Sequence, residues 1–243
     1  MGKMLIISAV AGLATVLGAL IVVALGKPSE RKLAAFLGGA AGIMLVVVVL
    51  DLIPSAITYG SIGVAFLGFI TGAAILWLLD KIISRFHDNR SSGMRDQAYL
   101  KKMGYLIAVG IALHDLPEGI AIAVGYAATE NLGLSLALAI GMHNIPEGMA
   151  VAAPMRMAQV KGIAILGLTL VVALFTPLGA LIGFALVTLS QNSMAFLLAL
   201  AGGAMGYIVV SELVPESMRR HPNYAKLGIA IGIIIMTTIW FLH

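Results

Sequence analysis

The chain has 243 residues, of which 60% are hydrophobic and only 11% are charged, and its mean hydropathy is +1.05. Soluble domains carry roughly 25% charged residues, so this composition excludes an ordinary soluble domain and predicts an all-α membrane protein. The chain has no Cys, which excludes disulfides and thiolate ligands and leaves nitrogen, oxygen or thioether groups for any metal.

Apolar runs of the length that crosses a bilayer, about 20 residues, divide the chain into eight predicted spans. The first run could instead be a signal peptide, but it is long for one and no small-residue cleavage site follows it. The polar segment 80–102 is predicted to be a partly disordered loop, and a short turn around Glu130 and Asn131 joins spans four and five. A single transmembrane domain, 1–243, is therefore predicted, with spans at about 4–25, 33–57, 61–79, 103–128, 132–154, 162–189 (with Pro177 inside), 194–214 and 225–242.

The Lys and Arg residues lie almost entirely on one side of this topology. All of the 15 basic residues except Lys3 fall in the connections after spans one, three, five and seven. Positively charged loops stay in the cytoplasm, so both termini are predicted to be external, in a multi-pass protein of the inner or plasma membrane. The same bias explains the basic residues without a nucleic-acid partner, and the predicted partner is the lipid bilayer.

Two related motifs in spans four and five carry the strongest functional signal. The first, H-D-L-P-E-G-I-A, begins at His114, and the second, H-N-I-P-E-G-M-A, begins 29 positions later at His143. Each places an imidazole and a carboxylate four residues apart, on one helix face, as His114 with Glu118 and His143 with Glu147. Ionisable groups in apolar spans are costly, so these are expected to pair with one another or to bind a cation.

Packed face to face, the two motif helices would gather two imidazoles, three carboxylates and one amide. Asp115 supplies the third carboxylate and Asn144 the amide. This ligand set suits Zn, Fe, Mn, Co or Cd better than Mg or Ca, and it predicts a transition-metal site. A single buried His is usually a satisfied core residue, but two copies in neighbouring spans favour the metal hypothesis.

Each motif also holds a Pro and a Gly with a predicted structural role. Pro117 and Pro146 cannot donate a hydrogen bond to the carbonyl four residues back, so each is predicted to kink its helix. Carbonyls freed in this way are tolerated at membrane depth where they line a polar cavity. Gly119 and Gly148 are expected to let neighbouring helices approach closely.

Several other side chains allow two interpretations. Met44 could be an ordinary core residue, and Asp51, near Pro54, could be hydrated close to the membrane surface. Glu212 lies close to the cytoplasmic end of span seven and could be part of an ion path. The remaining histidines are expected to be solvated: His87, His221 and His243.

With the two motifs in spans four and five of eight, the whole chain resembles the ZIP (Zrt/Irt-like) family of divalent metal transporters. The resemblance implies a 3+2+3 bundle, in which spans one to three and six to eight form an inverted pseudo-repeat around spans four and five. It also implies a homodimer. The ligands of the transport site would be the His and Glu of both motifs: His114, Glu118, His143 and Glu147.

The resemblance assigns further residues to the site. Met44, which follows Gly38 and Gly42, matches a methionine that joins the first site in the bacterial branch. A neighbouring second site would use Asp115 and Asn144. Polar residues matching positions along the outer and inner paths of the ion are Asp51, Ser211 and Glu212.

Two departures from the family pattern bear on the second site. Members with a two-metal centre often carry a Glu before the Pro of span six, whereas this chain has Thr176 before Pro177. The predicted cytoplasmic loop holds only His87, where many relatives have a His-rich run. We therefore expect one complete site and a second that lacks a carboxylate, with Thr176 beside the path.

The sequence thus predicts a transporter, not an enzyme, that moves divalent transition metal, zinc foremost, from outside into the cytoplasm. The site ligands would strip the hydrated ion, and rocking of one helix group against the other would release it inward. An intramembrane metal-dependent hydrolase is the alternative, disfavoured because the motif is H-x-x-x-E and not H-E-x-x-H. A metal-gated sensor is a third hypothesis, for which no signalling domain is evident.

Overall fold

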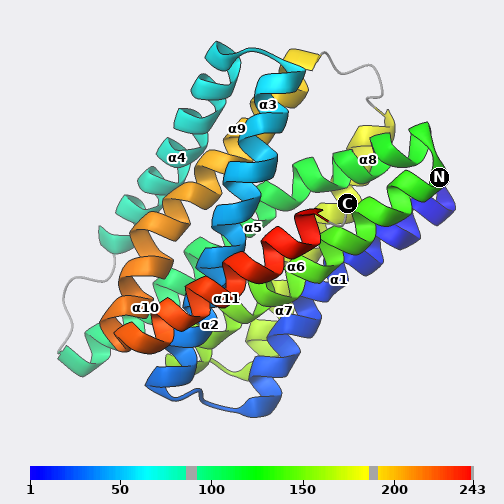
Figure 1. Cartoon of the computed structure of the whole chain (residues 1–243). Helices are drawn as coiled ribbons and strands as arrows, with labels where there is room; N and C mark the ends of the chain where they lie inside the picture. The colour runs from blue at the N-terminus through cyan, green and yellow to red at the C-terminus, as the bar shows by residue number, and fades with distance from the viewer. Residues whose placement is uncertain (86–91, 186–190, 242–243) are drawn as a thin grey trace.

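A computed structural model describes residues 1–85, 92–185 and 191–241, and within these ranges the chain is helical, with short turns and no strand (Figure 1). The first half contains α1 (Gly2–Leu25), α2 (Glu30–Val46), the π-helix η1 (Val47–Leu52), α3 (Ile53–Tyr59), α4 (Ile62–Arg85) and α5 (Ser92–Ala128). The second half contains α6 (Glu130–Met157), α7 (Gly162–Ala173), α8 (Phe175–Ala185), α9 (Gln191–Ile208), the π-helix η2 (Val209–Leu213), α10 (Val214–Arg220) and α11 (Pro222–Phe241).

Seven helical runs of the described residues are long and apolar enough to cross a membrane, which confirms the all-α membrane class. The predicted fifth span is not among the seven, although α6 is a helix of 28 residues. Its centre carries His143, Asn144 and Glu147, and these side chains lower its hydropathy. Span five, and with it a total of eight spans, therefore stays a prediction.

The motif helices α5 and α6 pack against each other and lie between the remaining helices. Helix α1 packs along α6 and α8 along α5, while α2 pairs with α11 and α4 with α9 (Figure 1). A Cβ at Gly119 would collide with the carbonyl oxygen of Thr176, and a Cβ at Gly148 with that of Thr15. The two glycines thus permit close helix contacts, as predicted, and hold the motifs at the centre of the bundle.

The polar segment 80–102 is not the loop that its composition predicts. Helix α4 continues to Arg85 and α5 already begins at Ser92, so only residues 86–91, with His87, lie outside the description. Charged residues in this segment are held by ion pairs across the bundle, including Asp96 with Arg220 and Lys102 with Asp80. These long-range pairs stabilise helix where local composition alone favours a loop.

Two further boundaries differ from expectation. Only Thr129 separates α5 from α6, so the turn predicted around Glu130 and Asn131 is wrong, and both residues belong to α6. Span six is divided into α7 and α8 at Leu174. The division follows from Pro177, which has no N–H to donate to the carbonyl of Ala173. Helices α5 and α6, by contrast, continue through Pro117 and Pro146.

The bundle has two chemically different ends. The first and last described residues lie at one end, which we call the terminal end (Figure 1). The connections rich in Lys and Arg gather at the other, the basic end, where Arg220 pairs with Glu30 and the side chain of Val23 lies against Gly162. This grouping follows from the alternating direction of the helices.

Candidate metal centre

The two motifs converge on a small buried cluster between α5 and α6. An Oε1 atom of Glu118 lies 2.7 Å from Nε2 of His143, within a hydrogen bond, and 2.7 Å from Nε2 of His114. Glu147 Oε1 lies 4.0 Å from His114 Nε2. One ligand atom each from His114, His143 and Glu147 fall within 4.8 Å of one another. A single cation between the helices could therefore contact all four side chains.

Many polar atoms of this cluster lack a hydrogen-bond partner. Among the described residues, both oxygens of Glu147, Oε2 of Glu118 and Nδ1 of His143 are buried and unpaired. Neither nitrogen of His114 has hydrogen-bond geometry, although Nε2 is close to Glu118. Buried polar groups in native proteins are almost always satisfied, so a concentration of unsatisfied donors and acceptors indicates a ligand. Imidazole and carboxylate together favour a transition-metal ion.

A second group of buried polar side chains adjoins the first. Asp115, Asn144 and Thr176 are fully buried, and Asp115 lies close enough to Thr176 and Glu118 to interact with both. Asn144 donates to the carbonyl of Ala11 at 3.1 Å, which leaves its Oδ1 unpaired. Both oxygens of Asp115 and the hydroxyl of Thr176 are also unpaired. This group therefore offers oxygen ligands, and Asp115 is its only carboxylate.

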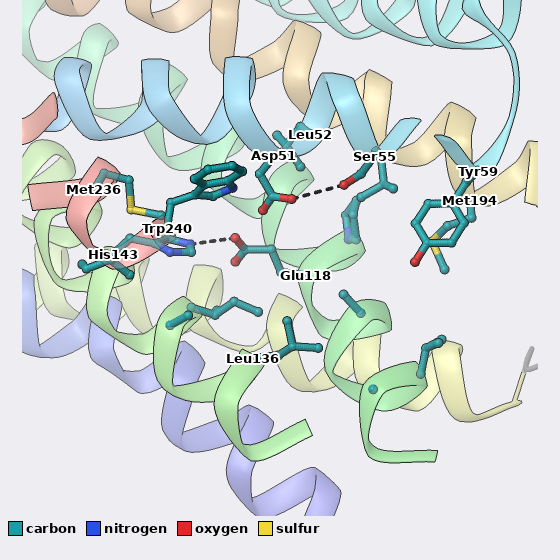
Figure 2. Close-up of a pocket in the computed structure, with 18 of the residues that line it drawn as sticks. Asp51, Leu52, Ser55, Tyr59, Glu118, Leu136, His143, Met194, Met236 and Trp240 are labelled. Carbon is teal, nitrogen blue, oxygen red and sulfur yellow. Dashed lines mark hydrogen bonds and ion pairs between the residues drawn. The ribbon is translucent and has the colours of Figure 1, made fainter. Parts of the chain in front are cut away.

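A cavity of about 940 Å³ leads from the terminal end to the cluster (Figure 2). Glu118 and His143 form its polar floor, and Asp51 lies on its wall with Ser55 donating to it at 3.3 Å. The aromatic residues Tyr59 and Trp240 also line the cavity. The cavity gives the centre a route to one side of the bundle, and the cavity position of Asp51 agrees with a place on the ion path.

Three other predicted site residues are not among the contacts described for the cluster. Met44 is buried in the main apolar core of the bundle, so its proposed role as a ligand stays a prediction. Ser211 is exposed on η2, whereas Glu212 is buried and accepts a hydrogen bond from Tyr99, and their place on the ion path stays a prediction.

Of the three histidines expected to be solvated, only His221 is described. The prediction is wrong for this residue, because its ring is half-buried and packs edge-on against Tyr224 with the centroids 4.8 Å apart. The prediction for His87 and His243 falls on residues outside the described ranges.

Ion pairs at the basic end join helices that are far apart in sequence, and no motif in the sequence indicates them. Lys102 Nζ lies 2.5 Å from Asp80 Oδ1 and 3.7 Å from Glu212 Oε1. Tyr99 donates to Glu212, and Tyr207 donates to Asp80. The available signal was positional, since Lys102 and Asp80 directly border apolar spans. We call the three charged residues the latch: Asp80, Lys102 and Glu212.

Sequence reasoning also passed over Thr15 of α1. Its hydroxyl is buried and unpaired, and its carbonyl oxygen packs on Gly148 as that of Thr176 packs on Gly119. The two threonines therefore hold corresponding positions beside the two motif helices. The signal was a lone Thr in an apolar span, a pattern too common to select by itself.

The chain is also similar in sequence to known proteins over most of its length. The family model for the ZIP zinc transporter matches residues 87–240, which is more than half of the chain. The zinc transporter ZupT of Chlorobium luteolum is 33% identical over 96% of this chain and 94% of its own length. ZupT of Enterobacter sp. (strain 638) is 35% identical over 96% and 93%, and ZupT of Corynebacterium glutamicum is 33% identical over 93% of each chain.

Proposed function

The chain belongs to the ZIP zinc transporter family and is a membrane transporter of divalent metal ions; we propose that it carries zinc through the cluster between α5 and α6. The observation that carries this proposal is a cavity that ends on Glu118 and His143, with further unsatisfied ligands behind them. The relatives are zinc transporters by name, and the hydrolase hypothesis has no support among them.

The binding step follows from the charges of the cluster. Asp51 would attract the hydrated ion into the cavity, and the ion would then displace the contacts of Glu118 with the two imidazoles. Glu118 and Glu147 supply two negative charges, which neutralise one divalent cation. Ring nitrogens of His114 and His143 would complete the ligand set. The ion would thus exchange its bound water for protein ligands at mid-membrane. Met44 is proposed as a further ligand on the strength of the family resemblance.

The direction of transport rests on the basic residues. Loops rich in Lys and Arg stay in the cytoplasm, so the basic end would face inward and the cavity outward. The structure would then be an outward-open state. Release of the ion requires the basic end to open, and movement of the outer helices around α5 and α6 as an inverted 3+2+3 repeat would achieve it. The termini would be external and the membrane the plasma membrane.

Flux in proteoliposomes tests the transport proposal. Purified protein should move zinc down its gradient, with competition by Cd, Co, Fe or Mn, and Glu118→Ala should bind less metal. Metal bound without flux, together with turnover of a peptide or ester substrate, would overturn transport in favour of the hydrolase.

Cysteine labelling tests the orientation, since the chain has no native Cys. Asn223 at the basic end and Asn131 at the terminal end are both exposed. Asn131→Cys should react with an impermeant maleimide in intact cells and Asn223→Cys only after permeabilisation. The reverse pattern would show that the cavity faces the cytoplasm.

Cross-linking of the same variants in membranes would test the homodimer that the family resemblance implies.

A further inference from the structure

The latch joins three separate helical segments at the basic end. Lys102 belongs to α5, Asp80 to α4 and Glu212 to η2, and their side chains are only 10%, 20% and 3% exposed. Hydroxyl groups of Tyr99 and Tyr207 occupy further oxygens of the two acids. The pairs are therefore partly shielded from water, where attraction between charges is stronger than at an open surface.

The sign of the interaction between α4 and η2 depends on Lys102. Asp80 and Glu212 carry like charges and are near enough to interact electrostatically. With the ammonium between them both acids are attracted to α5, and without it they repel each other. Removing one partner from a buried ion pair leaves the other charge uncompensated, which is strongly unfavourable.

The latch and the metal centre share one rigid element. Lys102 lies twelve residues before His114 on the continuous helix α5, which corresponds to about 18 Å along the helix axis. The cavity reaches the centre from the terminal end, so the latch lies on the opposite side of the centre from the open route. A displacement of α5 would change both the floor of the cavity and the latch.

We propose that Lys102 is a positioning residue of the transport cycle: its bridge to Asp80 and Glu212 holds the basic end closed while the cavity is open. The bridge must break before an ion can leave at the basic end. This inference rests on the proposed function for the passage of the ion. Closure itself is a property of the protein without metal and can be measured separately.

A second group of ion pairs lies beside the latch at the basic end. Glu216 is buried and accepts hydrogen bonds from both Arg219 and Arg220, and Asp96 of α5 pairs with the same arginines. The Arg219 side chain is 57% exposed, so solvent screens its pairs. Neutralising Arg219 should therefore open the basic end far less than neutralising Lys102.

A buried cysteine can report whether the basic end is closed. Ile208 is 1% exposed on α9, next to η2, and its Cδ1 atom packs on Gly110 of α5. The chain has no native Cys, so Ile208→Cys would be the single reactive thiol. Its rate of reaction with a small polar maleimide, measured in detergent without metal, depends on neither membrane orientation nor transport.

In this background, Lys102→Gln should raise the labelling rate about tenfold, because two unneutralised acids favour the open population. Lys102→Arg keeps the charge and should restore a rate within about twofold of the parent. Lys3→Gln is the matched control, since it removes an exposed ion pair with Glu130 at the terminal end. It should leave the rate unchanged.

An unchanged rate in a folded Lys102→Gln protein, or an equal rise in Lys3→Gln, would overturn the proposal. Should Lys102→Gln lose its cooperative melting transition, Asp80→Asn gives the same test, because it removes only one arm of the bridge. It should raise the rate about threefold, and a rate equal to the parent would count against the latch. Failure of zinc flux with a correct labelling pattern would refute the transport proposal alone.

Discussion

The two π-helices share a local design but differ in their surroundings. In η1, Asp51 precedes Pro54 by three residues, and in η2, Glu212 precedes Pro215 by three. Each segment contains an i to i−5 hydrogen bond, as in the pair from the Val214 amide to the Val209 carbonyl. The proline directly after it lacks an N–H, which favours this local rearrangement of the helix. Both segments thus place an acid at a break in a spanning helix.

The environments of the two acids are opposite. Asp51 lies on the wall of an open cavity and has only Ser55 as a hydrogen-bond donor in the described residues. Glu212 is buried and held by Lys102 and Tyr99. One local motif can therefore place an acid in an open cavity or in a buried ion pair, because side chains from other helices determine the surroundings of the acid. The two ends can be compared experimentally through the centre that lies between them.

The largest effect is expected at the centre itself. Glu118→Ala removes the carboxylate that contacts both imidazoles, so zinc flux in proteoliposomes should fall about 100-fold or more. Glu130→Ala is the control, because that acid is exposed at the terminal end and should retain parental flux. Wild-type flux in Glu118→Ala would show that the ion does not pass through this cluster.

A smaller change is expected when one imidazole is lost. His143→Ala leaves the carboxylates in place, so zinc affinity should fall about tenfold while the preference for zinc over manganese narrows. Competition binding with the two metals measures both quantities. His221→Ala removes an imidazole outside the centre and should change neither. An undiminished zinc preference in His143→Ala would contradict its assignment as a ligand.

The second group of buried oxygens can be tested by adding the missing charge. Thr176→Glu places a carboxylate beside Asp115, so the number of tightly bound zinc ions should rise from about one toward two. Transport should slow, because an ion held by more negative charge leaves more slowly. Calorimetric titration measures the stoichiometry. The control is Thr176→Gln, because Gln has the size of Glu without its charge, and it should keep about one tightly bound ion. Two equally tight ions in the wild type would contradict the argument from the missing carboxylate.

The smallest effect is expected at the open end. Asp51→Asn removes one charge from the cavity wall, so the zinc concentration for half-maximal flux should rise about threefold to tenfold with maximal flux nearly unchanged. Ser55→Ala removes only the hydrogen bond to this acid and should change the value less than twofold. A fall in maximal flux in Asp51→Asn would instead show that the residue acts in the transport step, as proposed for the latch.

The amino-acid sequence alone was enough to predict the membrane class of the protein and the side chains that the motif helices bring together. Composition and run length indicate membrane helices whatever their packing, because apolar segments of about 20 residues match the thickness of the hydrocarbon core. The repeated His and Glu at a spacing of four fix which side chains share a face, since helical geometry is local. His114, Glu118, His143 and Glu147 were for that reason predictable before any contact was known.

The route to those residues, and the ion pairs on their other side, depend on how the helices pack in three dimensions. The pairing of Lys102 with Asp80 and Glu212 joins three segments far apart in sequence, and so does the cavity between Asp51 and His143. The same pairing stabilises helix in the described parts of the polar segment, residues 80–85 and 92–102. Local composition cannot predict such outcomes, because the free energy of a buried charge depends on partners that other helices bring to it.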